Sequence, residues 1–373
     1  MNPIERMQAV LHHKTPDRLP FFHVDHHLPR GEKERIARDR GMGIICYRPC
    51  YLESLSNVEV VMRPGRDGFV REYVTPIGTL SEKLVHGPGY GLAGYDRDWR
   101  GIVPRRKEFL VKKPEDYRVL ECIVENVHYE PYYYPIEDQI ERMGVDGIVV
   151  ADLPYEPMER LLIEWVEWRR FYTDLRKNTS LLEGICSILQ DRYEKELFPI
   201  AANSPSEVIR YSGNLDGFLV SPPMFEHDYA PSYAKCAEIM HANDKLLNVH
   251  MDGRLRLLAK SIAESRVDIV EAFTPPPMGD LPMDEALRLW SNKIIWVNLP
   301  SSISTLMGPS PYSMKRYLVE LLELMIPGER VAIVASTENR VPEENIEAMV
   351  DVMQQATLPL SKETIDKLRA SCE

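Results

Sequence analysis

The stretch LLNVHMDGRLRLLAKSIAESRVDIVEAFTP, residues 246–275, contains a strand, a helix and a second strand. LLNV has the apolar character of a short buried strand, residues 254–265 are helical, and DIVEAF is another buried strand. A strand that is followed by a crossover helix and a further strand is the unit from which parallel sheets are built. The stretch therefore predicts an α/β fold with a parallel sheet covered by helices.

The same alternation of strand and helix extends along most of the chain. Seven strands are predicted, at residues 19–24, 147–154, 206–214, 246–253, 268–275, 293–300 and 330–337. The pattern does not locate an eighth strand, but a single (β/α)8 TIM barrel over residues 1–373 fits the alternation best. An open doubly wound sheet is the alternative, although no GxGxxG motif follows any of these strands.

Three segments lie outside this alternation. A helix is predicted at residues 3–13, before the first strand. Residues 58–86 combine turn signals with alternating β-rich runs, which predicts β-hairpins added to the barrel. Residues 86–99, HGPGYGLAGYDRDW, are rich in Gly and Tyr and form either a lid over a site or a plain surface loop.

The composition limits the classes of partner. A net charge of −12 and a pI near 5.4 argue against nucleic acid, because binding phosphates requires a basic face. The six cysteines form no CxxC pair, which is typical of free thiols in the cytoplasm. The start, MNPIERMQAVLHH, is a polar amphipathic helix rather than a signal peptide, and no apolar run reaches the roughly 20 residues that span a bilayer. We therefore expect a cytoplasmic protein without a membrane or nucleic-acid partner.

Polar residues gather where the predicted strands end, which in a (β/α)8 barrel is where the chemistry takes place. The candidates are His23, Asp25, Asp152, Tyr211, Asn214, His250, Asp252, Glu271, Trp296, Asn298, Ser336 and Glu338. Several also have a purely structural interpretation. Asp152 and Asp252 are suited to capping the next helix, and the two asparagines to satisfying turn backbone. Glu271 is harder to explain in this way, because a buried carboxylate must be paired, protonated or metal-bound.

Four of these residues form a candidate zinc site. His250 and Asp252 are two residues apart and therefore point to one face of their strand. Glu271 and Glu338 end two other strands, and zinc accepts one imidazole together with carboxylates. Three ligands with one outer residue would leave the open position that a catalytic zinc needs. The group HVDHH, residues 23–27, is a weaker metal candidate, because strand alternation divides its side chains between two faces.

Three motifs, in order, resemble the uroporphyrinogen decarboxylase superfamily. ERMQAVLHHKTPDRLPFF (5–22) resembles its opening helix and DR-x-P strand. Residues 248–280 resemble its middle, in which a His-x-x-Gly strand end precedes a Glu-containing strand and a Pro-rich GD loop. TENRVPEENIEAMV (337–350) resembles its C-terminal strand-to-helix junction. The resemblance covers nearly the whole chain and implies a single (β/α)8 barrel.

Differences within the superfamily indicate which branch the chain resembles. Uroporphyrinogen decarboxylases carry an Arg-rich segment after the first strand, where this chain has FHVDHHLPRG with Arg30 alone. Thiol-methylating corrinoid methyltransferases have His-x-Cys where this chain has Asp252 in place of the Cys. An oxygen-rich site suits the polarisation of an ether oxygen, as in the substrate:corrinoid methyltransferases of anaerobic aromatic O-demethylases. Residues 153–175 and KIIWVNLP (293–300) also resemble that branch.

The resemblance implies a methyltransferase that moves the methyl group of a methoxylated aromatic compound to cob(I)alamin on a separate corrinoid protein. The implied catalytic residues are His250, Asp252 and Glu271, the implied zinc ligands are the same three with Glu338, and the implied aromatic pocket contains Tyr211, Asn214, Trp296 and Asn298. Two alternatives stay open. One is a decarboxylase or other lyase for a smaller carboxylated substrate, with several Arg in its pocket, and the other is a non-catalytic binding or corrinoid-handling protein. A homodimer is also left open.

Overall fold

The computed structural model describes residues 1–28, 31–85, 105–304, 310–336 and 341–372. The chain divides into two compact units. The barrel unit consists of Met1–Cys50, Tyr133–Leu153 and Ser204–Glu373, and the insert unit consists of Tyr51–Tyr132 and Pro154–Asn203. The chain therefore leaves the barrel unit and returns to it twice. No helix in the described ranges is long and apolar enough to cross a membrane.

The barrel unit contains a closed barrel of parallel strands in the order β1-β14-β13-β12-β11-β10-β9-β2. Its strands are β1 (Phe21–Val24), β2 (Gly43–Pro49), β9 (Gly147–Leu153), β10 (Val208–Tyr211), β11 (Leu246–His250), β12 (Ile269–Phe273), β13 (Ile294–Val297) and β14 (Val331–Ala335). Each of the seven predicted segments contains one of these strands, so the prediction of a (β/α)8 barrel is confirmed and the open sheet is ruled out.

The strand that the sequence pattern did not locate is β2, with the sequence GIICYRP. It closes the barrel by pairing in parallel with β1 on one side and β9 on the other. Its first four residues are buried, whereas its last three are only half-buried and two of them are polar or Pro. This mixed end hides the strand in the sequence, because only four apolar or small residues carry the strand signal.

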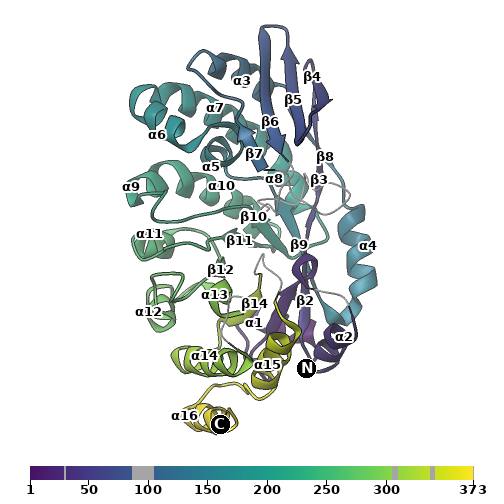
Figure 1. Ribbon diagram of the computed structural model, residues 1–373, viewed down its shortest axis with the longest axis vertical. Coiled ribbons are helices and arrows are strands. Elements are labelled where there is room, and N and C mark those ends of the chain that lie inside the picture. Colours follow the sequence, from purple (N-terminus) through teal and green to yellow (C-terminus); the bar gives the residue numbers. More distant parts are fainter. Residues whose placement is uncertain (29–30, 86–104, 305–309, 337–340, 373) are drawn as a thin grey trace. The chain divides into compact units, whose positions relative to one another are not determined.

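Helices surround the barrel strands. They are α1 (Pro3–Leu11), α2 (Glu32–Asp39), α4 (Tyr134–Met143), α9 (Pro222–Met224), α10 (Ala230–His241), α11 (Ala259–Glu264), α12 (Met283–Leu289), α13 (Ser301–Ser304), α14 (Pro311–Leu324), α15 (Glu343–Met353) and α16 (Lys362–Ala370). Helices α10, α11, α12 and α14 follow one another along the outside of the barrel (Figure 1). The predicted N-terminal helix is α1, which begins with a capping box between Asn2 and Glu5.

The insert unit combines two antiparallel sheets with helices. Its elements are β3 (Tyr51–Leu55), β4 (Glu59–Pro64), β5 (Gly68–Thr75), β6 (Gly78–Val85), β7 (Arg105–Glu108), β8 (Val127–Pro131), α3 (Asp116–Glu125), α5 (Pro157–Arg160), α6 (Trp168–Lys177), α7 (Thr179–Arg192) and α8 (Phe198–Ala202). Strands β4 to β7 form one sheet in sequence order, and β3 pairs with β8. The hairpins predicted at 58–86 are confirmed. The predicted loop at 86–99 lies outside the described residues.

The interior of the barrel is filled by apolar side chains from its strands. The cluster includes Phe22, Val24, Ile45, Val150, Val208, Ile269, Ile294, Trp296, Ala332 and Val334. These residues identify the inward-facing positions, because side chains two apart in a strand share a face. The next inward position towards the carboxyl end of several strands is polar, and these polar side chains form the site described below.

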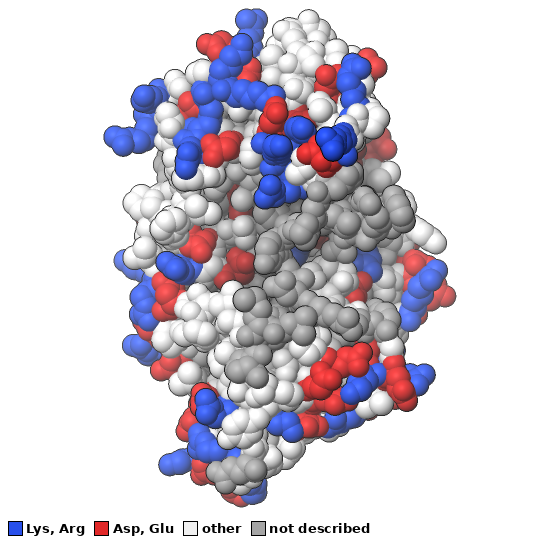
Figure 2. Space-filling view, viewed as in Figure 1, with Lys and Arg blue, Asp and Glu red and all other residues white. Residues whose placement is uncertain are grey.

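Charged side chains of both signs are interspersed over the described part of the face in Figure 2.

Within the insert unit, one buried cation, Arg160, contacts several of its neighbours. Arg160 on α5 donates from Nη2 to both carboxylate oxygens of Glu53, at 2.9 Å each, and from Nη1 to the hydroxyl of Tyr129 at 2.9 Å. Its guanidinium also lies 4.8 Å from the ring centroid of Trp165. Arg160 therefore links the β3–β8 pair to the helices of the insert unit.

We predict that Arg160→Leu lowers the free energy of unfolding by roughly 3 kcal/mol, because it leaves a partly buried carboxylate and a phenol without their partner. The matched control is Arg63→Leu, since Arg63 is 64% exposed and pairs with Glu72 within the β4–β5 hairpin. That change is expected to cost less than about 1 kcal/mol. Urea unfolding of the full chain measures both variants, and equal losses would contradict the structural role given to Arg160.

Candidate active site

Polar residues continue four inward-facing rows of the barrel at its carboxyl end. The apolar positions and the polar positions two residues later are Ile45 and Tyr47, Val150 and Asp152, Val208 and Arg210, and Ile269 and Glu271. The strand alternation places each pair on one face. The barrel core thus ends in a polar layer, at the end of the fold where (β/α)8 enzymes hold their active sites.

Glu271 is the centre of this layer and is 1% exposed. The Tyr47 hydroxyl donates to Oε1 at 3.0 Å, and Nδ1 of His250 lies 2.5 Å from Oε2. Arg210 Nη1 is 4.0 Å from the same Oε2. A carboxylate buried in an apolar barrel needs such partners to stay ionised, and here three strands supply them.

The backbone at Glu271 is irregular. The pairing of β12 with β13 shifts by one residue between Val270 and Phe273, so β12 carries a bulge at this point. Ala272, inside the bulge, has φ = 59°, a left-handed conformation that costs free energy for any residue with a Cβ. The amide of Met251 on the neighbouring strand donates to the carbonyl of Glu271 at 2.8 Å. The bulge thus lies on the β13 side of Glu271, whereas on the β11 side Glu271 is in register with His250.

Arg210 is held from two sides. Its Nε and Nη2 donate to the two oxygens of Asp152, at 2.7 and 3.1 Å, and its guanidinium lies 4.0 Å from the ring centroid of Tyr47. Asp152 also accepts from the hydroxyl of Ser212 at 3.0 Å. A bidentate pair of this kind fixes the plane of the guanidinium. Arg210 is therefore a rigid element between Asp152, Tyr47 and Glu271.

These contacts decide the charges of the site. Burial by itself lowers the pKa of His250, but the negative charge of Glu271 and the hydrogen bonds to Asp252 and Glu271 outweigh it and raise that pKa to about 10. Burial raises the pKa of Glu271, but the charge and hydrogen bond of His250 and the charge of Arg210 lower it below its usual value. At neutral pH the pair therefore consists of an imidazolium, His250, beside a carboxylate, Glu271. Nε2 of His250 lies 3.6 Å from Oδ2 of Asp252.

The three predicted catalytic residues His250, Asp252 and Glu271 are therefore brought together, but in the described ranges no group of three His, Cys, Asp or Glu is arranged to hold a metal ion. Both oxygens of Glu271 are engaged by Tyr47 and His250, and Arg210 approaches the same carboxylate. The described residues thus do not fit zinc by themselves. The fourth predicted ligand, Glu338, lies outside the described residues, so the zinc site stays a prediction.

The four residues of the predicted aromatic pocket have different surroundings in the structure. Tyr211 is fully buried, and its hydroxyl contacts Ser232 of α10 at 3.1 Å, on the face of β10 opposite to Arg210. Asn298 Oδ1 accepts from the amides of Leu299 and Ser336, which is the turn-satisfying role that the sequence allowed. Asn214 is half-buried after the end of β10. Trp296 is fully buried within the barrel core cluster.

In the HVDHH group, the rings of His26 and His27 lie against each other, with 4.1 Å between their centroids. Asp25 accepts from Arg48 Nη2 at 2.7 Å and contacts Nδ1 of His26 at 3.2 Å. His23 is buried, with Nδ1 3.0 Å from the carbonyl of Val24. Asp25, His26 and His27 form a 3-10 turn after β1 rather than part of the strand, so the division between two faces that was predicted from strand alternation does not apply to them.

Sequence reasoning missed Tyr47 and Arg210. Tyr47 lies on the strand that the pattern did not locate, so its inward position was not recognised. Arg210 lies inside a predicted strand, one residue before the strand end that was taken as the candidate. A signal did exist for Arg210, because counting two residues from the buried Val208 selects it rather than Tyr211.

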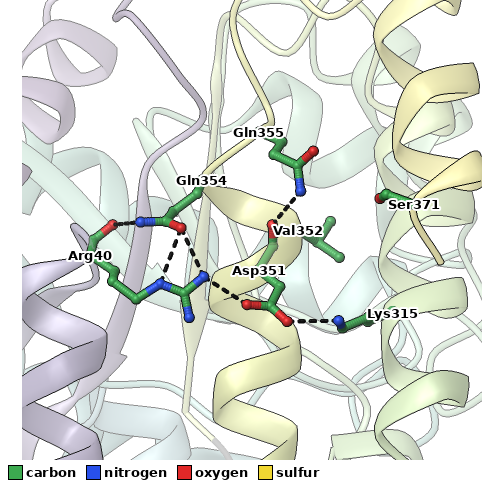
Figure 3. Close-up of a pocket in the computed structure, with 7 residues that line it drawn as sticks. All are labelled: Arg40, Lys315, Asp351, Val352, Gln354, Gln355 and Ser371. Carbon is green, nitrogen blue, oxygen red and sulfur yellow. Dashed lines mark hydrogen bonds and ion pairs between the residues drawn. The ribbon is translucent and has the colours of Figure 1, made fainter.

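A pocket of about 160 Å³ lies elsewhere, between helices of the barrel unit (Figure 3). Arg40 after α2 and Lys315 on α14 both pair with Asp351 on α15, each at 2.6 Å, and Arg40 also donates to Gln354. Asp351 is near the C-terminal end of α15, and helices that follow barrel strands end at the amino face of the barrel. The paired charges and this location indicate a contact that stabilises the helix layer.

No family model matches the sequence, and no curated protein matches it. Among solved structures, a methyltransferase from Methanosarcina mazei is similar with a TM-score of 0.55 and 14% identity over 99% of both chains. A glycoside hydrolase family 5 enzyme from Prevotella bryantii B14 has a TM-score of 0.40 and 8% identity over 88% of this chain and 87% of its own. Endo-glycoceramidase II from Rhodococcus sp. has a TM-score of 0.41 and 13% identity over 93% of this chain and 81% of its own. The first similarity shows a shared (β/α)8 barrel fold.

The Asp25–Arg48 pair yields a prediction for pH. Burial raises the pKa of Asp25, but the hydrogen bonds and charges of His26 and Arg48 lower it below its usual value. A depressed folded pKa contributes stability above the unfolded value, near 4, and this contribution is lost as the pH falls towards the folded value. We expect Asp25→Asn to lower the free energy of unfolding at pH 7 and to differ progressively less from the wild type between about pH 4 and 2.

Urea unfolding across this pH range measures the difference between the two proteins. Asp191→Asn, at a 59% exposed carboxylate on α7, is the control and should follow the wild type closely. A gap between Asp25→Asn and the wild type that stays constant down to pH 2 would show that the ion pair does not stabilise the fold.

Proposed function

We propose that the chain is a methyltransferase that moves the methyl group of a methoxylated aromatic compound to cob(I)alamin on a separate corrinoid protein. The observation that carries the proposal is the His250–Glu271 pair at the carboxyl ends of two adjacent barrel strands. His250 is 23% exposed at its side chain, whereas Glu271 is buried beneath it. The fold shared with a methyltransferase and the three superfamily-like motifs in the sequence support the same class of reaction.

Cleavage of an aryl methyl ether requires help at the oxygen, because an aryloxide leaves poorly. Cob(I)alamin, when the corrinoid protein is docked, supplies the nucleophile that accepts the methyl group. In the proposed reaction the C–O electron pair stays on the ether oxygen, and His250 delivers the proton of Nε2 to that oxygen as the bond breaks. A positioned general acid of this kind typically contributes roughly 10²- to 10⁴-fold in rate.

The other residues of the site would keep this proton donor in place. Glu271 accepts from Nδ1 of His250 and so sets the orientation of the ring. Tyr47 and Arg210 hold Glu271 from two other strands, and Asp152 holds Arg210. Asp252, 3.6 Å from Nε2, provides a carboxylate through which the proton lost in each turnover is replaced. No step of this mechanism is assigned to zinc, since the described residues do not fit it.

Arg48 on β2 and Arg210 on β10 do not favour the decarboxylase alternative. A decarboxylase for a carboxylated substrate would need Arg side chains that are available to that substrate. Arg210 forms a bidentate pair with Asp152, and Arg48 donates to Asp25, Gln139 and the carbonyl of Tyr47. The cations that β2 and β10 carry to this end of the barrel are therefore engaged by acceptors of the chain itself.

The proposal predicts that His250→Gln lowers the rate of methyl transfer from 2-methoxyphenol to a cob(I)alamin-loaded corrinoid protein by about 10²- to 10⁴-fold. The matched control is His241→Gln, because His241 forms a comparable pair with Asp268 at 2.8 Å, at the opposite end of β12. That variant should keep the wild-type rate. A wild type without transfer, or a His250→Gln variant that is as fast as the wild type, would contradict the proposed role.

Metal analysis of the purified chain tests the predicted zinc site separately. From the contacts of Glu271 we expect well below one zinc per chain in the wild type, and unchanged content in Glu271→Ala. About one zinc per chain, lost in both Glu271→Ala and Glu338→Ala, would instead establish the four-residue site that the sequence predicts. Circular dichroism of both variants confirms that any loss of metal does not reflect loss of the fold.

A further inference from the structure

Asn248 and Trp296 are polar side chains of the barrel interior whose polar atoms have no hydrogen-bond partner among the described residues. Asn248 on β11 is fully buried, and in the described part of the chain neither its Nδ2 nor its Oδ1 has a partner. Trp296 on β13 is also fully buried, and its Nε1 has no partner there either. Buried polar groups without partners are rare and costly in native proteins, and each such case calls for a water or a ligand atom.

Asn248 faces the interior of the barrel, directly below the proposed proton donor. It lies two residues after Leu246, which packs against the core cluster, and two before His250, which contacts Glu271. Residues at this spacing share a face of the strand. Its register partners in the neighbouring strands are Arg210 and Ile269. The unpaired amide therefore points into the barrel between the apolar core and the Glu271 layer.

Trp296 lies on β13, two strands away from Asn248 on β11, and also faces the interior of the barrel. It lies two residues after Ile294, and both belong to the core cluster inside the barrel. Ile294 is the register partner of Ile269, so Trp296 is at the level of Glu271 along the barrel axis. Two strand spacings amount to about 10 Å, and both side chains point inwards. Asn248 and Trp296 thus both lie on inward-facing positions, at successive levels of the barrel axis.

We propose that Asn248 and the Trp296 Nε1–H form the site that recognises a hydroxyl substituent on the aromatic substrate, which deepens the proposed function and rests on it. A hydroxyl donates to Oδ1 of Asn248 and accepts from its Nδ2–H or from the indole N–H, so it satisfies both kinds of unpaired atom. A carboxylate would leave Oδ1 without a donor and would lie beside the negative charge of Glu271. The site therefore selects a neutral hydroxyl.

Two probes of nearly the same shape test this site by isothermal titration calorimetry. We expect the wild type to bind 2-methoxyphenol at least about fivefold more tightly than 2-methoxytoluene, which lacks the hydroxyl. Asn248→Leu, which keeps the branched shape and the number of heavy atoms of the side chain, should bind the two probes equally. No binding of either probe to the wild type, or the same ratio in Asn248→Leu, overturns the proposal.

Thermal stability separates this role from an ordinary structural one. Asn248→Leu removes a buried amide that has no protein partner, so its Tm in the absence of ligand should rise by a few degrees. Asn345→Leu is the control, because Asn345 is buried as well but donates to the carbonyl of Ser304 at 3.1 Å, and its Tm should fall. A fall in Asn248→Leu as large as that of the control overturns the proposal.

A crystal structure of the wild type with 2-methoxyphenol supplies the decisive outcome. A phenol oxygen within hydrogen-bond distance of Asn248 supports the proposal, whereas ordered water alone on the amide of a ligand-bound barrel overturns it. The failure of the proposed function is distinct from this. If the hydroxyl preference and its loss in Asn248→Leu are observed but no methyl transfer occurs, the recognition site stands and the reaction assigned to His250 does not.

Discussion

The burial of one carboxylate governs the carboxyl end of this barrel. Glu271 is placed in the interior by β12, where an isolated negative charge would cost several kcal/mol. The chain meets that cost with a phenol from β2, an imidazole from β11 and a guanidinium from β10. Arg210 is held in turn by Asp152 and lies over the ring of Tyr47, and β12 carries a bulge directly after Glu271, at Ala272. The site is therefore a connected network rather than a collection of separate strand ends.

This network depends on the order of the barrel strands. The carboxylate can hold His250 in one orientation because β11 and β12 are neighbours with His250 and Glu271 in register. It can stay ionised because β10 and β2 bring their polar residues to the same inward layer. Asn248, whose amide has no partner among the described residues, lies two residues before His250 on the same inward face of β11.

Local patterns in the sequence were sufficient for most of the architecture. Apolar runs such as LLNV and DIVEAF, separated by helical segments, predicted the parallel barrel and seven of its strands. They also predicted that His250, Asp252 and Glu271 lie together, because the carboxyl ends of neighbouring strands meet at one end of the fold. The pattern did not predict β2, because the half-buried end of this strand resembles a loop. Tyr47 lies on β2 and was therefore not predicted as a site residue.

By itself, the sequence determined the strands, the helices and the candidates that end each strand, since these follow from residue spacing along one segment. Only the tertiary structure decided which candidates touch one another. Tyr211 faces α10 and Arg210 faces Glu271, although they are adjacent in the chain, because one residue reverses the side of a strand. The contacts of Glu271 with Tyr47 join residues 224 positions apart. Such pairings depend on barrel closure and register, and a linear pattern contains neither.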